Sequence, residues 1–228
     1  MRRAGRRDLL VSLTALAVLL VWDATGADLA VVRWYGTGGG FSWRDAWLTR
    51  NLLHDGGRWL AWGLLGLLVI DSFRSLLPGP TRTERWGWIG AILVCVLLVP
   101  SLKRISQTSC PWDLTEFGGV AHYVSHWQFS VADGGPGHCF PSGHAVAGFA
   151  FFGVYFLWRE HRPALARWVL AAVLLVGATF GWAQLARGAH YPSHTLWSAW
   201  LCWTVCALGA WAFAGWRPAG IRGGTGNV

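Results

Sequence analysis

The sequence predicts an all-α, polytopic membrane protein with six transmembrane helices. Of its 228 residues, 54% are hydrophobic and only 13% are charged, whereas soluble domains average about 25% charged residues. The apolar residues also gather in uncharged blocks, and a helix needs roughly 20 such residues to cross about 30 Å of hydrocarbon. We therefore expect one membrane domain over residues 1–228.

Six blocks without a formally charged side chain mark the expected helices. They cover residues 9–22, 59–70, 86–102, 145–158, 168–186 and 195–216. The third, fifth and sixth approach spanning length alone, whereas the second needs flanking residues, for example 56–77. The eighteen tryptophans fit a membrane protein, because indole rings collect at membrane interfaces.

The basic residues predict the orientation. Six spans put both termini on one side, and twelve of the nineteen basic residues fall there, including Arg217 and Arg222, against seven on the other side. Positive charge marks the cytoplasmic side. Both termini are therefore expected in the cytoplasm, with the histidine-rich loops facing outward.

The N-terminus allows an alternative. The arginines of residues 2–7, an apolar core and small residues at 24–27 also resemble a secretory signal. Cleavage would leave five spans and termini on opposite sides, against the arginine distribution. Topology also explains the net charge of +8, and because this charge is divided among loops, no nucleic-acid partner is expected.

The longest outward segment, residues 103–141, is expected to carry part of a functional site. Ordered loops of this length are often functional. Seven of the eight histidines fall on the outward side, and only His161 does not. Residues 45–54 fit equally well a short amphipathic helix on the outer leaflet or an ordinary loop.

Two cysteines, Cys110 and Cys139, lie outside the expected spans. An oxidising compartment favours a disulfide between them, and the alternative is two free thiols. The bridge would close about 30 residues and stabilise the fold by roughly 3 kcal/mol. The other cysteines fit small apolar fillers within spans; they are Cys95, Cys202 and Cys206.

The residues before the fourth block combine small, polar and titratable side chains. Ser142 is placed to cap a helix, Gly143 lets backbone N–H groups approach an anion, and His144 titrates near neutral pH. Lys103 is the only lysine, and its compact ammonium suits a phosphate oxygen. Together these residues favour a phosphate site over an ordinary helix cap.

A second loop carries His190 and His194, four residues apart, after Arg187. The arginine can donate a forked pair of hydrogen bonds to phosphate oxygens. The two histidines with His144 would also suit zinc. No carboxylate completes that site convincingly, so we expect neither a metal nor another cofactor.

These residues resemble the type-2 phosphatidic acid phosphatase superfamily of membrane lipid phosphatases. Its pattern is Lys-x6-Arg-Pro, Pro-Ser-Gly-His and Ser-Arg-x5-His-x3-Asp. The second motif matches fully at residues 141–144. The first matches from Lys103 with Cys110 in place of arginine, and the third has Gln184 for arginine and His194 for aspartate. The resemblance covers nearly the whole chain.

The resemblance implies a metal-independent phosphohistidine mechanism. His190 would attack phosphorus, and His144 would protonate the leaving oxygen and then activate water. Lys103, Arg187 and the cradle of Ser142 and Gly143 would hold the phosphate oxygens.

The departures from the motifs leave two roles to fill. Arg187 lies one helical turn from Gln184 and can replace one family arginine, and Arg104 is a weaker substitute for the other. The residue that orients His190 is expected to be His194, Asp113 or Glu116, with the two carboxylates preferred because they follow Cys110.

We therefore expect hydrolysis of a phosphomonoester or diphosphate on a lipid head group at the outer face of a bacterial inner membrane. Undecaprenyl diphosphate, phosphatidylglycerol phosphate, phosphatidic acid and lipid A all remain candidate substrates. The alternatives are phosphoryl transfer from a lipid diphosphate to another lipid, and a non-catalytic protein that binds or transports lipid.

Overall fold

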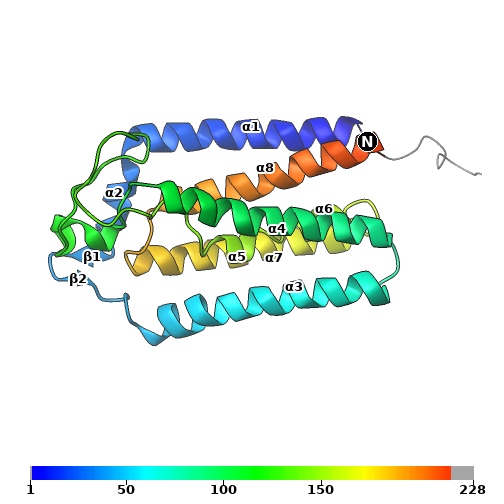
Figure 1. Cartoon of the computed structure of the whole chain (residues 1–228), viewed down its shortest axis with the longest axis horizontal. Helices are drawn as coiled ribbons and strands as arrows, with labels where there is room; N and C mark the ends of the chain where they lie inside the picture. Colours follow the sequence, from blue (N-terminus) through cyan, green and yellow to red (C-terminus); the bar gives the residue numbers. More distant parts are fainter. Residues whose placement is uncertain (1, 217–228) are drawn as a thin grey trace, which may run out of the picture.

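The computed structural model describes residues 2–216 and is a bundle whose long helices lie side by side with roughly aligned axes (Figure 1). The α-helices are α1 (Arg2–Thr25), α2 (Ala27–Val32), α3 (Gly57–Arg74), α4 (Arg82–Ile105), α5 (Val146–Phe149), α6 (Phe152–Trp158), α7 (Pro163–Ala186) and α8 (Pro192–Trp216). A π-helix, η1 (Leu48–Gly56), two 3-10 turns, η2 (Pro111–Asp113) and η3 (Thr115–Phe117), and an antiparallel pair, β1 (Gly36–Thr37) with β2 (Gly40–Phe41), complete it. The all-α class is confirmed, while Arg217 and Arg222 lie outside the described residues.

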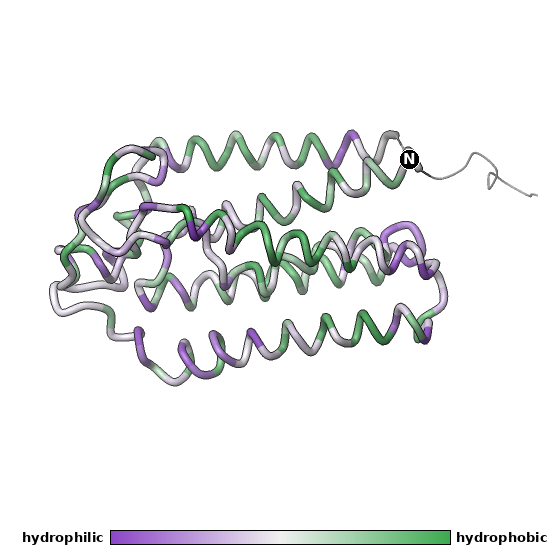
Figure 2. The backbone as a smooth tube through the Cα atoms, viewed as in Figure 1, coloured by the Kyte–Doolittle hydropathy of each residue, from purple (hydrophilic) through white to green (hydrophobic). Residues whose placement is uncertain are grey.

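Four of the described helices are long and apolar enough to cross a membrane. They cover Gly5–Thr25, Arg82–Ile105, Pro163–Ala186 and Pro192–Phe213, and Figure 2 shows their apolar stretches between polar ends. The second expected span, α3, has 18 residues and carries charges at both ends, at Arg58, Asp71 and Arg74. The chain is thus a helical, multi-pass membrane protein by composition, and six spans remain a prediction.

The fourth expected span is divided into α5 and α6. At the break, the N–H of Phe151 donates to the carbonyl of Gly148, and the N–H of Val154 donates to that of Phe151. These bonds join residues three apart, as in a 3-10 turn, so the helix tightens there. Gly148 also lies against α7, where an added Cβ would come within 2.7 Å of the Gly177 backbone. Close contact with α7 therefore accompanies the broken helix.

Residues 45–54 were expected to form either a short amphipathic helix or an ordinary loop, and most of them belong to the π-helix η1. Backbone angles stay helical through Gly56 and Gly57, so η1 runs on into α3 without a loop. Gly57 packs on α7, where a Cβ would lie 2.6 Å from the ring of Phe180. Only a glycine lets the start of α3 approach α7 this closely.

The long segment, residues 103–141, is folded against the loop that precedes α8. Asp133 accepts hydrogen bonds from the N–H of Ser109 at 2.6 Å and from its hydroxyl at 2.9 Å. The predicted disulfide between Cys110 and Cys139 is present, with a Cα–Cα distance of 5.2 Å. The N–H of Trp112 then donates to the Gly188 carbonyl at 2.9 Å, which links the long segment to the loop carrying His190.

All of these loops lie at one end of the bundle, and the N-terminus lies at the other (Figure 1). A small apolar cluster packs together at the loop end of the bundle. Its buried members are Val32, Phe41, Leu114, Phe117, Ala121 and Tyr191. The larger core lies between α4, α5, α6, α7 and α8. The loops and the helix ends beside them therefore lie together at one end of the bundle.

Candidate active site

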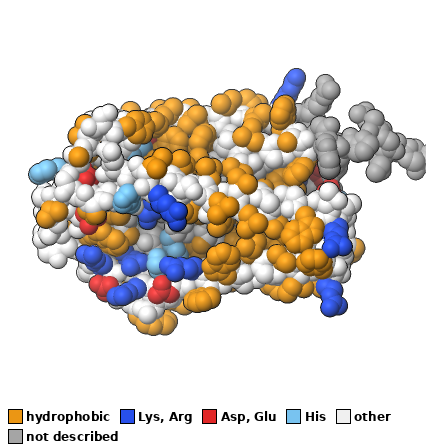
Figure 3. Space-filling view, in the orientation of Figure 1, with side chains coloured by type: hydrophobic (Ala, Val, Ile, Leu, Met, Phe, Trp, Pro, Cys, Tyr) orange, Lys and Arg blue, Asp and Glu red, His pale blue; other side chains and the backbone are white. Residues whose placement is uncertain are grey.

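A cavity of about 580 Å³ opens at the loop end of the bundle. Its polar lining is His54, Arg58, Lys103, Gly143, His144, Gln184, Arg187 and His190, and its apolar lining includes Ala61, Leu65, Ile92, Val96, Val146 and Phe151. Figure 3 shows basic and histidine side chains gathered toward this end. Five residues predicted from three distant parts of the sequence therefore share one cavity.

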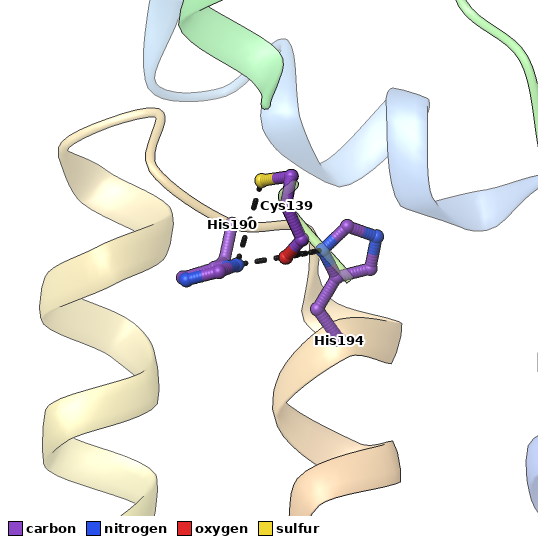
Figure 4. Close-up of side chains that lie close together, drawn as sticks. All are labelled: Cys139, His190 and His194. Carbon is purple, nitrogen blue, oxygen red and sulfur yellow. Dashed lines mark hydrogen bonds between the residues drawn. The ribbon is translucent and has the colours of Figure 1, made fainter. Parts of the chain in front are cut away.

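His190 is 3% exposed, and its Nδ1 lies 3.6 Å from Cys139 Sγ and 3.4 Å from His194 Nδ1 (Figure 4). Burial lowers the pKa of His190 well below its usual value, and the positive charge of Lys103 lowers it further. The carbonyl of Cys139 acts in the opposite direction, as a hydrogen-bond acceptor. A neutral ring that donates from Nδ1 to this carbonyl keeps a lone pair on Nε2.

His194 contacts the same carbonyl. Its Nδ1 lies 3.1 Å from the Cys139 oxygen, and the side chain is 1% exposed. With its Nδ1–H directed at this oxygen, His194 has no lone pair on that nitrogen to orient His190. A backbone carbonyl, held by the disulfide, is thus the acceptor beside His190. Sequence reasoning missed it because no side-chain identity encodes a carbonyl.

Three predicted residues, Asp113, Glu116 and Arg104, lie away from both the cavity and His190. Asp113 accepts the N–H of Cys110 at 3.2 Å, because the η2 turn folds the carboxylate back onto its own start. Glu116 pairs on the surface with Arg33 at 2.6 Å. Neither carboxylate bonds His190, and exposed Arg104 does not line the cavity. The disulfide brings Cys110 into place without bringing the carboxylates that follow it.

The segment 142–144 differs in detail from a capped helix start. α5 begins at Val146 with Ala145 before it, so Ser142 does not cap it. The N–H of Ser142 donates to the His194 carbonyl at 3.1 Å, while its buried hydroxyl has no hydrogen-bond partner among the described residues. Gly143 faces Lys103, whose Cδ would lie 3.7 Å from an added Cβ. The Ser142 N–H is therefore not available to an anion, and Ser142 itself is not among the residues that line the cavity.

His144 is held by η1. Its Nε2 donates to the Leu53 carbonyl at 3.0 Å, and its ring stacks on His54 with 4.5 Å between centroids. Burial, and then the charge of His54, lowers the pKa of His144 to about 4. Its Nδ1 is left for a ligand. This contact gives the π-helix a role, since such turns are frequent at functional sites.

Gln184 and Arg187 supply donors where the third motif departs from the family. The side-chain nitrogen of Gln184 is buried without a hydrogen-bond partner among the described residues, and an unsatisfied buried donor calls for an explanation. Arg187 donates from Nε to the Arg44 carbonyl at 2.9 Å and forms no ion pair in the described chain. Burial lowers the pKa of the Arg187 guanidinium. Both side chains line the cavity.

Two cavity residues, His54 and Arg58, were not predicted as site residues. They lie at the junction of η1 and α3, far from the three motifs in sequence. The one signal for His54 was the outward excess of histidines. The predicted zinc alternative also changes, because the three-ligand cluster found among the described residues is Cys139, His190 and His194, without His144.

A sequence model of the PAP2 superfamily, the type-2 phosphatidic acid phosphatases, matches residues 85–218. Comparisons with curated proteins and with solved structures gave no match. Members of the superfamily are phosphatases. The matched segment includes Lys103, the full second motif and His190, all of which the fold brings to one end of the bundle. By this match over more than half of its length, the chain belongs to the PAP2 superfamily.

Proposed function

We propose that this protein is a lipid phosphatase that removes phosphate from a phosphomonoester or diphosphate head group. One observation carries the proposal: a single cavity joins a cationic end to an apolar wall. Lys103, Arg187 and Arg58 suit a phosphate, and residues such as Ala61, Leu65 and Val96 suit the adjoining acyl or prenyl chain. A lipid phosphate has both parts.

In the first step, Nε2 of His190 attacks phosphorus and the bond from phosphorus to the leaving oxygen breaks. The leaving oxygen takes a proton from Nδ1 of His144. In the free enzyme His144 is neutral, because its pKa is about 4. The negative charge of the bound phosphate favours its protonated form, since an opposite charge nearby raises the pKa of a histidine.

In the second step, water attacks the phosphohistidine and gives its proton to His144. The phosphorus–nitrogen bond breaks, orthophosphate leaves and neutral His190 returns. Lys103, Arg187 and the amide of Gln184 contact the phosphate oxygens in both steps. Donors already fixed in position stabilise the charge of the transition state without reorganising. These steps use no metal.

The proposed setting is a bacterial inner membrane crossed six times, with the cavity on the outer face. The basic residues of the sequence support this orientation, because more of them fall on the side of the termini. The cavity lies at the opposite end of the bundle from the N-terminus (Figure 1). The substrate would then reach the cavity from the outer leaflet.

Phosphate release by the purified protein in liposomes tests the proposal. The panel contains phosphatidic acid, phosphatidylglycerol phosphate, undecaprenyl diphosphate and lipid A, with and without EDTA. We expect His190→Asn to fall to background and His144→Asn to lose about 10²–10⁴-fold. His122→Asn, an exposed histidine in the long segment, is the matched control.

Two results would contradict the proposal: turnover by His190→Asn, or inhibition of the wild type by EDTA. With donor lipid labelled in its phosphate, free labelled phosphate supports hydrolysis. Label in a second lipid would instead indicate a phosphotransferase.

A further inference from the structure

Three possible metal ligands meet beside the cavity. Cys139 Sγ, His190 Nδ1 and His194 Nδ1 all lie within 4.8 Å of one another (Figure 4). Sγ and His190 Nδ1 are 3.6 Å apart, and the two ring nitrogens are 3.4 Å apart. The three residues are 0%, 3% and 1% exposed. Cys139 comes from the long segment, His190 from the loop before α8 and His194 from the first turn of α8.

Two of the three separations match the edges of a zinc tetrahedron, and the third, between Cys139 Sγ and His194 Nδ1, is at most 4.8 Å. Zinc binds sulfur at about 2.3 Å and histidine nitrogen at about 2.0–2.1 Å. Tetrahedral angles then put sulfur and nitrogen about 3.6 Å apart and two nitrogens about 3.3 Å apart. The first contact equals its expected edge, and the second is within about 0.1 Å of it.

The disulfide with Cys110 now occupies the sulfur. Cys110 lines the cavity, so a small reductant can reach the bond. A phosphine reductant gives two electrons to the disulfide, and water supplies the oxygen of the phosphine oxide and the two protons of the resulting thiols. Cys110 then becomes a second sulfur ligand, once its Sγ moves to the spacing of about 3.8 Å that two thiolates take on one zinc ion.

We propose that the reduced protein binds one zinc ion through Cys139, His190 and His194, with Cys110 as the fourth ligand. Binding releases the thiol protons, and each ring binds through Nδ1 and carries its proton on Nε2. The disulfide and the metal therefore exclude one another. The oxidised protein has no such site.

The consequence for catalysis rests on the proposed function. A neutral imidazole has one lone pair. When zinc takes the lone pair on Nδ1, Nε2 of His190 carries a proton and cannot attack phosphorus. Zinc thus inactivates the reduced enzyme and leaves the activity of the oxidised enzyme unchanged.

Cobalt binding tests the site without any catalytic readout, because a thiolate on Co²⁺ gives a charge-transfer absorption band. We expect the band in reduced wild type and none in oxidised wild type. Cys110→Ala and Cys139→Ala both lack the disulfide and keep the buried thiols of Cys95, Cys202 and Cys206. We expect the band in Cys110→Ala without reductant and no band in Cys139→Ala.

The comparison of reduced with oxidised wild type needs no variant and holds even where a substitution prevents folding. The proposal is overturned if reduced wild type shows no band, or if Cys139→Ala binds cobalt as Cys110→Ala does. In the activity arm, one equivalent of Zn²⁺ should lower phosphate release at least tenfold in reduced wild type and Cys110→Ala, reversibly with EDTA. Full phosphatase activity of the reduced protein with zinc bound would contradict the expected inactivation. Absence of phosphatase activity in every sample would contradict the proposed function and leave the cobalt result to stand alone.

Discussion

The Asp28 carboxylate accepts hydrogen bonds from both the backbone N–H and the hydroxyl of Ser193, with 2.9 Å to the N–H. Asp28 lies on α2 and is 5% exposed, and burial raises its pKa. Ser193 lies in the first turn of α8, between His190 and His194. A carboxylate at a helix N-terminus also interacts favourably with the helix dipole. Asp28 thus fixes the chain on which His190 is carried.

Asp28→Asn should lower kcat at least about tenfold, because small displacements of a reacting group cost up to about 10²-fold. Its amide would set a donor against the donors of Ser193. Unfolding should also become easier by about 1–3 kcal/mol. The control is Asp8→Asn, another buried carboxylate, paired with Arg159 at 2.7 Å near the opposite end. Equal kcat losses in both variants would contradict a positioning role for Asp28.

Gln184→Glu should raise KM for a lipid phosphate more than tenfold, because it replaces a buried donor by a charge that repels phosphate. Gln184→Leu should show a smaller rise, since it removes the donor without adding charge. Phosphate-release kinetics measure both. Exposed Gln128→Glu adds the same charge away from the cavity and should leave KM unchanged. Identical KM values for Gln184→Glu and wild type would argue against phosphate contact here.

Arg58→Gln should raise KM about tenfold and change kcat little, because a charge-assisted hydrogen bond contributes about 1.5–3 kcal/mol to binding. Arg58→Lys should keep most of the affinity. The matched control is Arg50→Gln in η1, whose side chain is paired with Asp45 at 2.7 Å and does not line the cavity. A large fall in kcat with constant KM would place Arg58 in the chemical step instead.

Ala61→Phe should weaken binding of long-chain lipid phosphates and leave a short, soluble phosphate ester unaffected. The added ring would fill the apolar wall of the cavity. Gly63→Phe is the control on the same helix, because a Cβ at Gly63 meets nothing within 4 Å. The ratio of kcat/KM for long and short substrates measures the effect. An unchanged ratio in Ala61→Phe would contradict lipid binding along this wall.

Stability should fall as pH decreases below about 6.5. The folded-state pKa of His144 is lowered to about 4, so the unfolded chain binds more protons between these values. The stabilisation is complete above the unfolded pKa and is lost as pH falls toward the folded pKa, roughly 2 kcal/mol between pH 7 and 5. Tm from tryptophan fluorescence should drop less in His144→Asn than in wild type. His122→Asn should behave as wild type; an equal drop in all three proteins would refute this origin.

The helical class was predictable from the sequence because block length and charge report directly on membrane helices. The break between α5 and α6 was not. No proline marks it, and the need for a glycine at 148 arises only from the close approach of Gly177 on α7. The continuation of η1 into α3 was equally hidden, since it depends on the packing of Gly57 against Phe180.

The site was predictable where a motif carries it. Lys103, His144, Arg187 and His190 share the cavity, and Cys110 pairs with Cys139 as expected. The acceptor beside His190 was not predictable, because the Cys139 carbonyl contributes no side chain and depends on tertiary folding. Asp28 lies outside every motif and acts through a contact 165 residues away.

The link between α2 and α8 also sets an order of events during synthesis. Asp28 is made early, and its partner Ser193 follows 165 residues later. Until α8 begins, the carboxylate has to stay hydrated or find another donor, because a buried charge without a partner is costly. Assembly of the loop that carries His190 therefore waits until α8 begins. A ribosome that stops at the end of α7 leaves a chain with most of the described helices but without His190, the residue that would carry the phosphoryl group.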